Sequence, residues 1–215
     1  MYPINLDING QPCLVIGGGR VAERKVRGLL AEKGAVTVIA PSLTPGLEEL
    51  AAAKALTWHC RTYEDGDEKP FFLILCATDD RALNERVAAA ARREGKLLNV
   101  CDVPDLCNFT LPSIVRQGDL ELTISTNGQA PALSRWLRRH LEKRFDERWS
   151  RGLTMLSRIR QEARTSLPTS KDRQDFWRQA LTDDIVELIE KDDLLQAESR
   201  LSAHLAVWER KTHET

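Results

Sequence analysis

The chain has 215 residues, a formal net charge of -1 at pH 7 and 29% charged residues. This length suits one large domain or a domain with an appendage, and it allows roughly 70% of the unfolded surface to be buried. The near-neutral charge argues against a dedicated nucleic-acid binder. Because the sequence has no long apolar span and no leader pattern at its start, we expect a cytoplasmic protein without a membrane contact.

The cysteines are odd in number, form no Cys-x-x-Cys pair, and in three cases lie within apolar, strand-like runs. Thiols buried in such runs are typical of reduced proteins rather than of secreted, disulfide-linked ones. We therefore expect free thiols at Cys13, Cys60, Cys76, Cys101 and Cys107.

The start of the chain predicts a strand, a turn and a second strand. Residues 2–12 have the pattern of a short strand and a turn, with Asn9-Gly10 as the turn signal. An apolar strand over residues 13–16 then breaks at three glycines, and a helical pattern continues to about Lys33. A strand, a glycine turn and a helix in this order open a βαβ unit.

The glycines carry the first functional motif. Gly17 and Gly19, with Ala22, match the G-x-G-x-x-G/A fingerprint of dinucleotide-binding domains. Gly17 permits the tight turn, Gly19 lets a pyrophosphate approach the backbone, and Ala22 lets the helix and strand pack closely. The first amides of the helix then face the phosphates. The motif predicts a dinucleotide cofactor bound by Gly17, Gly18, Gly19, Arg20 and Val21.

The next strand, over residues 36–40, decides less about the cofactor. It ends about 20 residues past the glycines, where an acidic residue normally holds the adenosine ribose. The sequence there is Ala40-Pro41-Ser42, without an acid or an arginine. Ser42 is able to bond a ribose hydroxyl, and the Pro41 backbone is able to line the adenosine site. The missing arginine slightly disfavours a 2′-phosphate, but the choice between NAD and NADP stays open.

Further elements follow with the alternation of strand and helix that is typical of a parallel sheet. In chain order we predict a helix over 47–55, a strand over 56–60, a charged loop over 64–69, a central strand over 71–77, a helix over 83–93, a strand over 97–101, a half-exposed strand over 120–125 and a helix from Pro131.

Two strand ends carry acidic residues. Thr78, Asp79 and Asp80 follow the central strand, and Asp102 follows the strand over 97–101. Since ligands of open α/β sheets bind beyond the carboxyl ends of the strands, Thr78 and Asp79 are candidate cofactor contacts and Asp102 lies at the rim of the crevice. The alternative for Asp79 and Asp80 is a role as helix N-caps only, and both readings stay open.

The last third of the chain is helical in pattern. The helix from Pro131 places one apolar stripe among basic residues, formed by Leu133, Trp136, Leu137, Leu141 and Phe145. Residues 146–215 contain few glycines and break at Pro168-Thr169-Ser170. Such a helical unit either forms a dimer interface or closes over the active site, or it packs as a bundle on its own chain.

Four motifs stand in a specific order over roughly residues 1–145. They are Gly17-Gly-Gly-Arg-Val-Ala-Glu-Arg-Lys25, Ala77-Thr-Asp-Asp80, Asn99-Val-Cys-Asp102 with Phe109-Thr-Leu-Pro-Ser-Ile114, and Ser125-Thr-Asn-Gly-Gln-Ala-Pro-Ala-Leu-Ser-Arg135. On these motifs the chain resembles the siroheme synthase family, specifically its precorrin-2 dehydrogenase module. No counterpart of the methyltransferase domain of the fused enzymes is expected.

The resemblance implies an α/β fold in three parts and an activity. The parts are an NAD-binding Rossmann domain over 1–112, a short dimerisation region over 113–145 and a helical C-terminal domain over 146–215. The activity is the NAD-dependent oxidation of precorrin-2 to sirohydrochlorin in siroheme biosynthesis, and some relatives also insert Fe²⁺. An intertwined homodimer is implied as well.

The resemblance also assigns roles to residues. The family's catalytic aspartate corresponds to Asp102, which is placed to act as a general base; Asp105 is a rival outside the motif, and a plain turn residue is the alternative. A substrate with many carboxylates needs amides and cations. We expect substrate contacts at Asn99, Thr126, Gly128 and Arg135.

The sequence also bears on two other functions and on a metal site. A short-chain dehydrogenase would need a Tyr-x-x-x-Lys pair, which neither Tyr2 nor Tyr63 forms. The other alternative is an NAD-binding regulatory module without catalysis. No permanent metal site is expected, since the histidines are scattered at His59, His140, His204 and His213.

Overall fold

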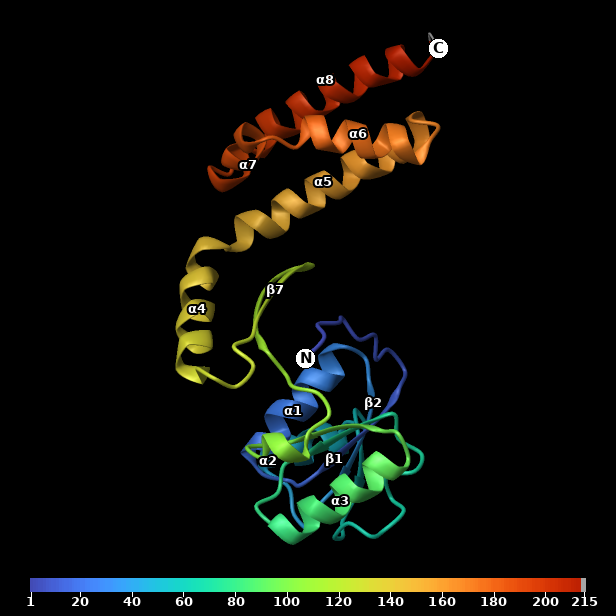
Figure 1. Cartoon of the computed structure of the whole chain (residues 1–215), viewed down its shortest axis with the longest axis vertical. Coiled ribbons are helices and arrows are strands. Elements are labelled where there is room, and N and C mark those ends of the chain that lie inside the picture. Colours follow the sequence, from blue (N-terminus) through green and yellow to red (C-terminus); the bar gives the residue numbers. More distant parts are fainter. Residues whose placement is uncertain (214–215) are drawn as a thin grey trace. The chain divides into compact units, whose positions relative to one another are not determined.

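The computed structural model describes residues 1–213, with side chains up to Lys211. The chain divides into two compact units, Met1–Leu111 and the part that begins at Pro112 (Figure 1).

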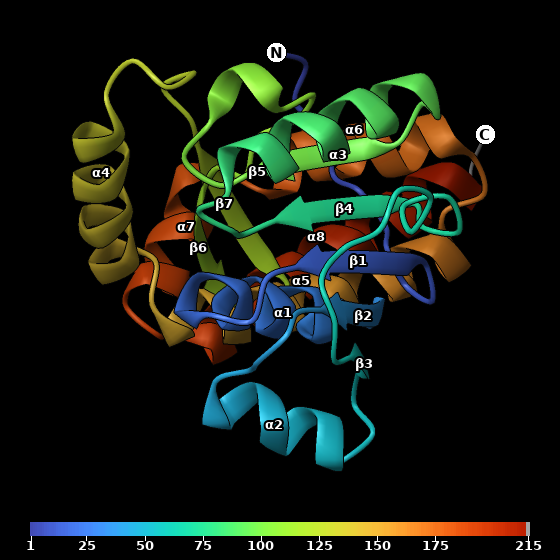
Figure 2. The same ribbon diagram turned by 90° about the horizontal axis from the view of Figure 1, so that it is seen from below.

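The first unit is built on a parallel sheet. Its strands are β1 (Pro12–Ile16), β2 (Ala35–Ile39), β3 (Thr57–His59), β4 (Leu73–Cys76) and β5 (Leu97–Val100). They pair in the order β3-β2-β1-β4-β5, all parallel (Figure 2). The order reverses between β1 and β4, and this switch point is where open α/β sheets bind dinucleotides.

Helices cover both faces of this sheet. They are α1 (Arg20–Ala31), α2 (Pro45–Ala52), α3 (Arg81–Arg93) and the short 3₁₀ helix η1 (Pro104–Leu106). Val26 of α1 packs with Val15 on one face, whereas Val87 of α3 packs with Leu14 on the other. Neighbouring strand residues thus point to opposite cores, which explains why β1 is apolar without alternation.

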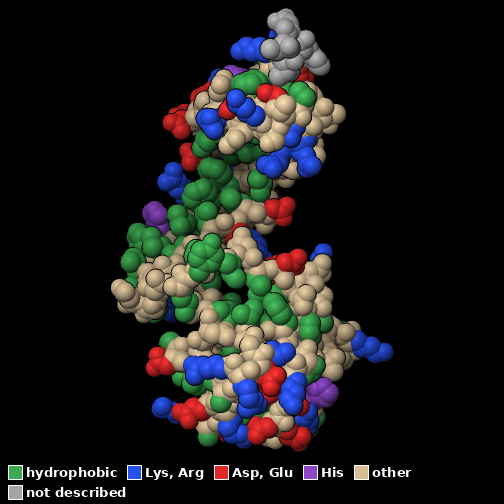
Figure 3. Space-filling view, turned by 45° about the vertical axis from the view of Figure 1, so that its right-hand side comes forward, with side chains coloured by type: hydrophobic (Ala, Val, Ile, Leu, Met, Phe, Trp, Pro, Cys, Tyr) green, Lys and Arg blue, Asp and Glu red, His purple; other side chains and the backbone are tan. Residues whose placement is uncertain are grey.

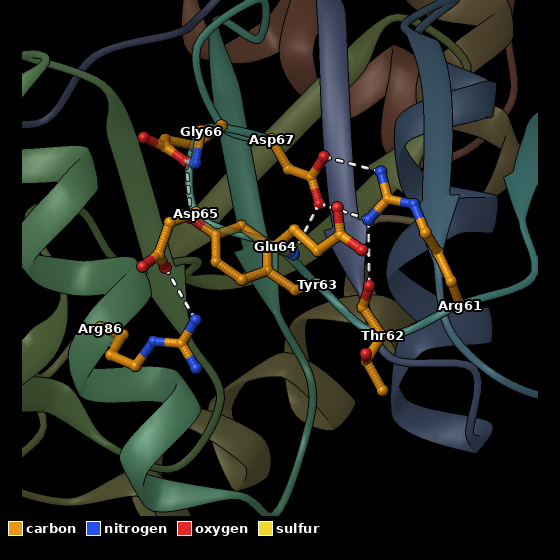
Figure 4. A network of polar contacts seen from close by, with 9 residues as sticks. Arg61, Thr62, Tyr63, Glu64, Asp65, Gly66, Asp67 and Arg86 are labelled. Atoms are coloured by element: carbon orange, nitrogen blue, oxygen red, sulfur yellow. Dashed lines mark hydrogen bonds and ion pairs between the residues drawn. The ribbon is translucent and has the colours of Figure 1, made fainter.

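A loop rather than a helix joins β3 to β4, and a polar network holds it (Figure 4). Tyr63 is buried in the α3-side core, and its hydroxyl donates to Glu68 Oε2 at 2.5 Å. Glu68 has no exposed surface, and Gly66 N donates to the same oxygen at 2.9 Å. Burial alone would raise the pKa of Glu68, but the hydrogen bonds from Tyr63 and from backbone amides hold it below its ordinary value.

We expect the substitution Tyr63→Phe to lower the free energy of unfolding by about 1–3 kcal/mol, because it removes a partner from a buried carboxylate. Urea unfolding at neutral pH measures this loss. Arg86→Gln is the matched control, since it breaks the exposed pair of Arg86 with Asp65 (2.8 Å) on the same loop and should cost less than about 1 kcal/mol. Equal losses in the two variants would contradict a special role for the buried pair.

The same carboxylate predicts acid sensitivity. The folded-state pKa of Glu68 is depressed, whereas its unfolded-state value is about 4.3. Such a group contributes stability above the unfolded pKa and loses it as the pH falls through the folded pKa. The unfolding free energy should therefore decline below about pH 4.3, and Glu68→Gln should decline less steeply. Parallel curves for the two proteins would show that Glu68 does not carry this dependence.

The second unit combines a hairpin with helices. The hairpin strands are β6 (Ser113–Gln117) and β7 (Leu120–Ile124), and the helices are α4 (Pro131–Arg144), α5 (Glu147–Ser166), α6 (Ser170–Ala180), α7 (Asp183–Glu190) and α8 (Leu194–His213). Ile159, Phe176 and Leu201 are fully buried in a core that α5 to α8 share. These four helices therefore pack as a bundle on their own chain.

The helix α4 differs from that bundle. Leu133 is 48% and Trp136 53% exposed, so the predicted stripe is not the core of its unit. Hydrophobic side chains are visible at the surface in this part of the chain (Figure 3). Among the described residues, none of the helices has the length and apolar character needed to cross a membrane.

One predicted element is wrong. Residues 1–8 form no strand, and only the turn at Asn9-Gly10 is present. Met1, Tyr2 and Ile4 are 75%, 88% and 66% exposed, and within this segment only Ile8 is buried in the core of the first unit.

Candidate functional site

The glycine turn lies at the carboxyl end of β1 and is held by backbone on two sides. Gly17 has φ +115°, and a Cβ there would stand 2.3 Å from Ala77 O. A Cβ on Gly18 would stand 1.9 Å from Ser42 O. The Thr44 amide also donates to Gly18 O at 2.9 Å. The first two glycines are therefore required by the close approach of the β1, β2 and β4 ends.

Gly19 has a different reason to be glycine. It is the N-cap of α1 with φ -83°, which any residue adopts, and a Cβ there would meet nothing within 4 Å. No side chain caps the helix, and Arg20 and Val21 are exposed. Open amides next to an empty Cβ position fit a dinucleotide pyrophosphate, which needs backbone donors and room.

The end of β2 supports this turn. Pro41 and Ser42 are exposed, and the Ser42 carbonyl faces Gly18. Thr44 donates from Oγ1 to Glu23 Oε2 at 2.6 Å, and Arg27 pairs with the other oxygen at 2.7 Å. The bond from Thr44 first, and that from Arg27 second, hold the pKa of Glu23 below its ordinary value. Glu23 thereby ties α1 to the β2–α2 loop.

The end of β4 separates the two acidic residues that follow it. Asp80 is the N-cap of α3, and its Oδ1 accepts from Leu83 N at 3.0 Å. Asp79 is exposed, and in the described part of the chain its carboxylate accepts no hydrogen bond. Thr78 is half-buried between them and the glycine turn. Asp80 thus has a capping role, and Asp79 is left free at the edge of the crevice.

The end of β5 carries Asp102 beside a cation. Asp102 is exposed and has φ +60°, a left-handed conformation that Asp and Asn tolerate better than most residues. Lys25 of α1 is half-buried and near Asp102 and Cys101; its burial lowers the pKa of the ammonium, and the two neighbours oppose this. Burial likewise raises the pKa of the Cys101 thiol, and Lys25 opposes that rise. Asp102 is therefore an accessible carboxylate that interacts electrostatically with Lys25.

The other predicted residues of this strand end have supporting positions. Asn99 is 9% exposed, and its Nδ2 donates to Phe109 O at 3.1 Å, so it holds the loop that follows Asp102. Asp105 lies in η1 and is exposed. The Cys107 thiol accepts from Val100 N at 3.1 Å. These contacts shape the loop around Asp102.

The remaining candidates belong to the second unit. Thr126 Oγ1 accepts from Ala130 N at 3.1 Å and lies 3.2 Å from Ser134 Oγ, which stabilises the turn before α4. Gly128 has φ +81° in this turn, and Arg135 is exposed in the first turns of α4. These three residues form one local group.

Three family models match successive parts of the chain. The one described as "Putative NAD(P)-binding" matches residues 4–113, "Sirohaem biosynthesis protein central" matches 117–144, and "Sirohaem synthase dimerisation region" matches 148–205. The first covers more than half of the chain. The chain belongs to the siroheme synthase family.

Individual relatives agree with this membership. The chain is 39% identical over 212 residues to siroheme synthase 1 of Klebsiella pneumoniae, which covers 99% of this chain and 45% of the relative. It is 39% identical over 186 residues to the siroheme synthase of Methylococcus capsulatus, covering 86% and 39% respectively. The chain thus spans less than half the length of these curated relatives.

A solved structure is similar over nearly the whole chain. The precorrin-2 dehydrogenase SirC is 26% identical to this chain and has a TM-score of 0.77. The match covers 93% of this chain and 100% of the SirC chain. The family membership and this structure confirm the predicted Rossmann-type α/β domain followed by a helical region. The first family model supports a cofactor of the NAD(P) type. In this chain, the open turn at Gly19 is the feature that fits such a cofactor.

The expectations for the cysteines and for a metal site can also be compared with the structure. The five cysteines are free thiols, as predicted, and Cys13 and Cys76 are buried. Within the described residues, no group of three His, Cys, Asp or Glu side chains could hold a metal ion. The side chain of His213 lies outside the described residues.

Sequence reasoning missed two residues of this site. Lys25 stands in the first motif, yet its approach to Asp102 depends on how α1 packs against the β5 end. Asn84 has no motif spacing that marks it, and it contacts the β4 end only through the fold of α3. A buried polar position among apolar ones in α3 was the available signal for Asn84.

Proposed function

We propose that this protein oxidises precorrin-2 to sirohydrochlorin with NAD as the hydride acceptor. The observation that carries the proposal is the open glycine turn at the same edge of the parallel sheet as the accessible Asp102. The names of its relatives, siroheme synthase and precorrin-2 dehydrogenase, supply the substrate class. Crevices at this switch point bind the dinucleotide next to the strand ends that carry catalytic groups.

In this proposal, residues of the chain bind and orient the cofactor, and one of them accepts a proton. Gly17, Gly18 and Gly19, with Arg20 and Val21, hold the pyrophosphate at the start of α1. The other cofactor contacts are Pro41, Ser42, Thr78 and Asp79. NAD, when bound, supplies the acceptor for the hydride.

Asp102 is the proposed general base. Oxidation of the reduced macrocycle removes a hydride and a proton, and the Asp102 carboxylate accepts the proton. Because Asp102 is exposed, it is able to pass that proton on to solvent. Lys25 places a positive charge near the carboxylate.

The proposed substrate contacts are Asn99, Thr126, Gly128 and Arg135. Thr126, Gly128 and Arg135 surround the start of α4, where amides and a guanidinium suit the carboxylate side arms of a tetrapyrrole. Asn99 acts by holding the loop after Asp102 through Phe109. Insertion of Fe²⁺ stays a prediction of the resemblance, and the assay below measures it.

We also propose the division into 1–112, 113–145 and 146–215, a homodimer and a cytoplasmic location. The free thiols support the location. The exposed Leu133 and Trp136 of α4 support a partner surface in the second segment. The family model whose description names the dimerisation region matches residues 148–205, in the third segment.

The test is a spectrophotometric assay of the purified protein with precorrin-2 and NAD, followed by addition of Fe²⁺. We expect NADH absorbance and the sirohydrochlorin spectrum to appear together. A further spectral change with Fe²⁺, faster than without protein, would add iron insertion. Binding of NAD without NADH formation would instead favour the NAD-binding regulatory module.

A further inference from the structure

Asn84 of α3 is a buried side chain with incomplete hydrogen bonding. It is 3% exposed, and its Nδ2 donates to Thr78 O at 3.0 Å. Its Oδ1 is buried and accepts no hydrogen bond in the part of the chain that the structure describes. A buried amide oxygen without a partner lowers stability, so Asn84 is a costly residue for its position.

Packing and helix formation do not require an asparagine here. The residues of α3 that share its buried side are apolar, as Val87, Ala88 and Ala91 show. Asparagine is a weaker helix former than leucine or alanine. The helix already has its N-cap in Asp80. The hydrogen bond to the Thr78 carbonyl is therefore the interaction that explains an asparagine at this position.

Thr78 follows a residue that lies close to the glycine turn. The carbonyl of Ala77, its neighbour, occupies the space that a Cβ on Gly17 would need, at 2.3 Å. Thr78 Oγ1 also accepts from Asp80 N at 3.1 Å, which folds the turn towards α3. A shift of Thr78 would therefore move Ala77 against the glycine turn or away from it.

We infer that Asn84 is a positioning residue for the dinucleotide: its amide anchors the β4–α3 turn and, through Ala77, sets the geometry of the glycine turn. The inference rests on the proposed cofactor contacts at Gly17 and Thr78. Asn84 itself touches neither the cofactor nor the substrate in this scheme. A site that is already shaped before NAD arrives lowers the cost of binding NAD.

The substitution Asn84→Leu separates positioning from structural support. Leucine fills the same apolar surroundings, removes the unpaired oxygen and leaves Thr78 O, on a half-buried residue, without its anchor. We expect a melting temperature equal to or above that of the wild type, and a dissociation constant for NAD raised by about tenfold. Thermal unfolding and calorimetric titration with NAD measure the two quantities.

Val87→Ala is the matched control, one turn further along the same buried face of α3. It should lower the melting temperature through lost packing and leave NAD affinity unchanged. Should Asn84→Leu fail to fold, Asn84→Ala removes the same amide without adding volume and should weaken NAD binding more than Val87→Ala does.

Two results would overturn the inference. One is wild-type NAD affinity in a folded Asn84 variant, and the other is an equal loss of affinity in Val87→Ala. The titration needs no tetrapyrrole, so its outcome is independent of the dehydrogenase assay. A protein that binds NAD as expected here, yet forms no NADH from precorrin-2, would refute the proposed function and leave the role of Asn84 standing.

Discussion

The Gly19→Ala variant is expected to fold and to lose most of its affinity for NAD. A Cβ at Gly19 meets no protein atom within 4 Å, and its φ of -83° suits alanine. The added methyl group instead fills the opening in front of the first amides of α1. We expect the dissociation constant to rise by about 10- to 100-fold, or about 1.4–3 kcal/mol, with a stability cost of at most about 1 kcal/mol at this N-cap.

Substitutions at two other glycines serve as controls for Gly19→Ala. Gly28→Ala lies in the same helix with open space around it, and it should raise stability by about 0.5–1 kcal/mol with NAD affinity unchanged. Gly18→Ala would place its Cβ 1.9 Å from Ser42 O, so both folding and binding should suffer. Wild-type affinity in Gly19→Ala would mean that the pyrophosphate does not approach the backbone there.

The second large effect is expected from Asp102→Asn. Asparagine tolerates the left-handed φ of +60° at this position, so the turn after β5 should keep its shape. Losing a positioned general base should lower kcat by about 10²- to 10⁴-fold. The dissociation constant for NAD should stay within about twofold, because Asp102 is not a proposed cofactor contact. Steady-state assays with precorrin-2, together with NAD titration, measure both values.

Asp105→Asn is the natural comparison for Asp102→Asn. Asp105 is also an exposed aspartate, in η1 a few residues further on. We expect its kcat to remain near that of the wild type. If Asp105→Asn loses turnover and Asp102→Asn keeps it, the proton acceptor has been assigned to the wrong residue.

The Rossmann sheet was predictable because burial on both faces leaves a clear mark on the sequence. The strands β1, β2, β4 and β5 are short apolar runs that end at glycine, proline or polar residues. The glycine turn was predictable from the spacing of its glycines between a strand and a helix. The close approaches of Gly17 to Ala77 and of Gly18 to Ser42 give it a physical cause.

Elements that depend on distant partners were less predictable. The segment before Asn9 has apolar residues in a strand-like pattern, yet residues 1–7 are exposed and pair with no strand among the described residues. β6 was not predicted, since a hairpin with one buried residue, Val115, has little hydrophobic pattern. The apolar stripe of α4 predicted a helix correctly, but the periodicity could not tell whether its own unit would cover it.

The candidate site shows the same limit. Gly19, Thr78 and Asp102 follow from strand ends and motif spacing alone. Asn84 lies only six residues after Thr78, yet its bond to the Thr78 carbonyl forms only when α3 is folded. Lys25 is near Asp102 although the two residues are far apart in sequence. Likewise, the pairing of Tyr63 with the buried Glu68 becomes visible only when the β3–β4 loop is folded.

The most direct test of the account is a single-turnover experiment with enzyme in excess over precorrin-2 and with NAD present. It should compare the NADH formed with the sirohydrochlorin formed, with Asp102→Asn as the control. We expect equal amounts of the two products with the wild type and very slow formation of both with Asp102→Asn. Sirohydrochlorin formed without matching NADH, or NAD bound with no product at all, would contradict it.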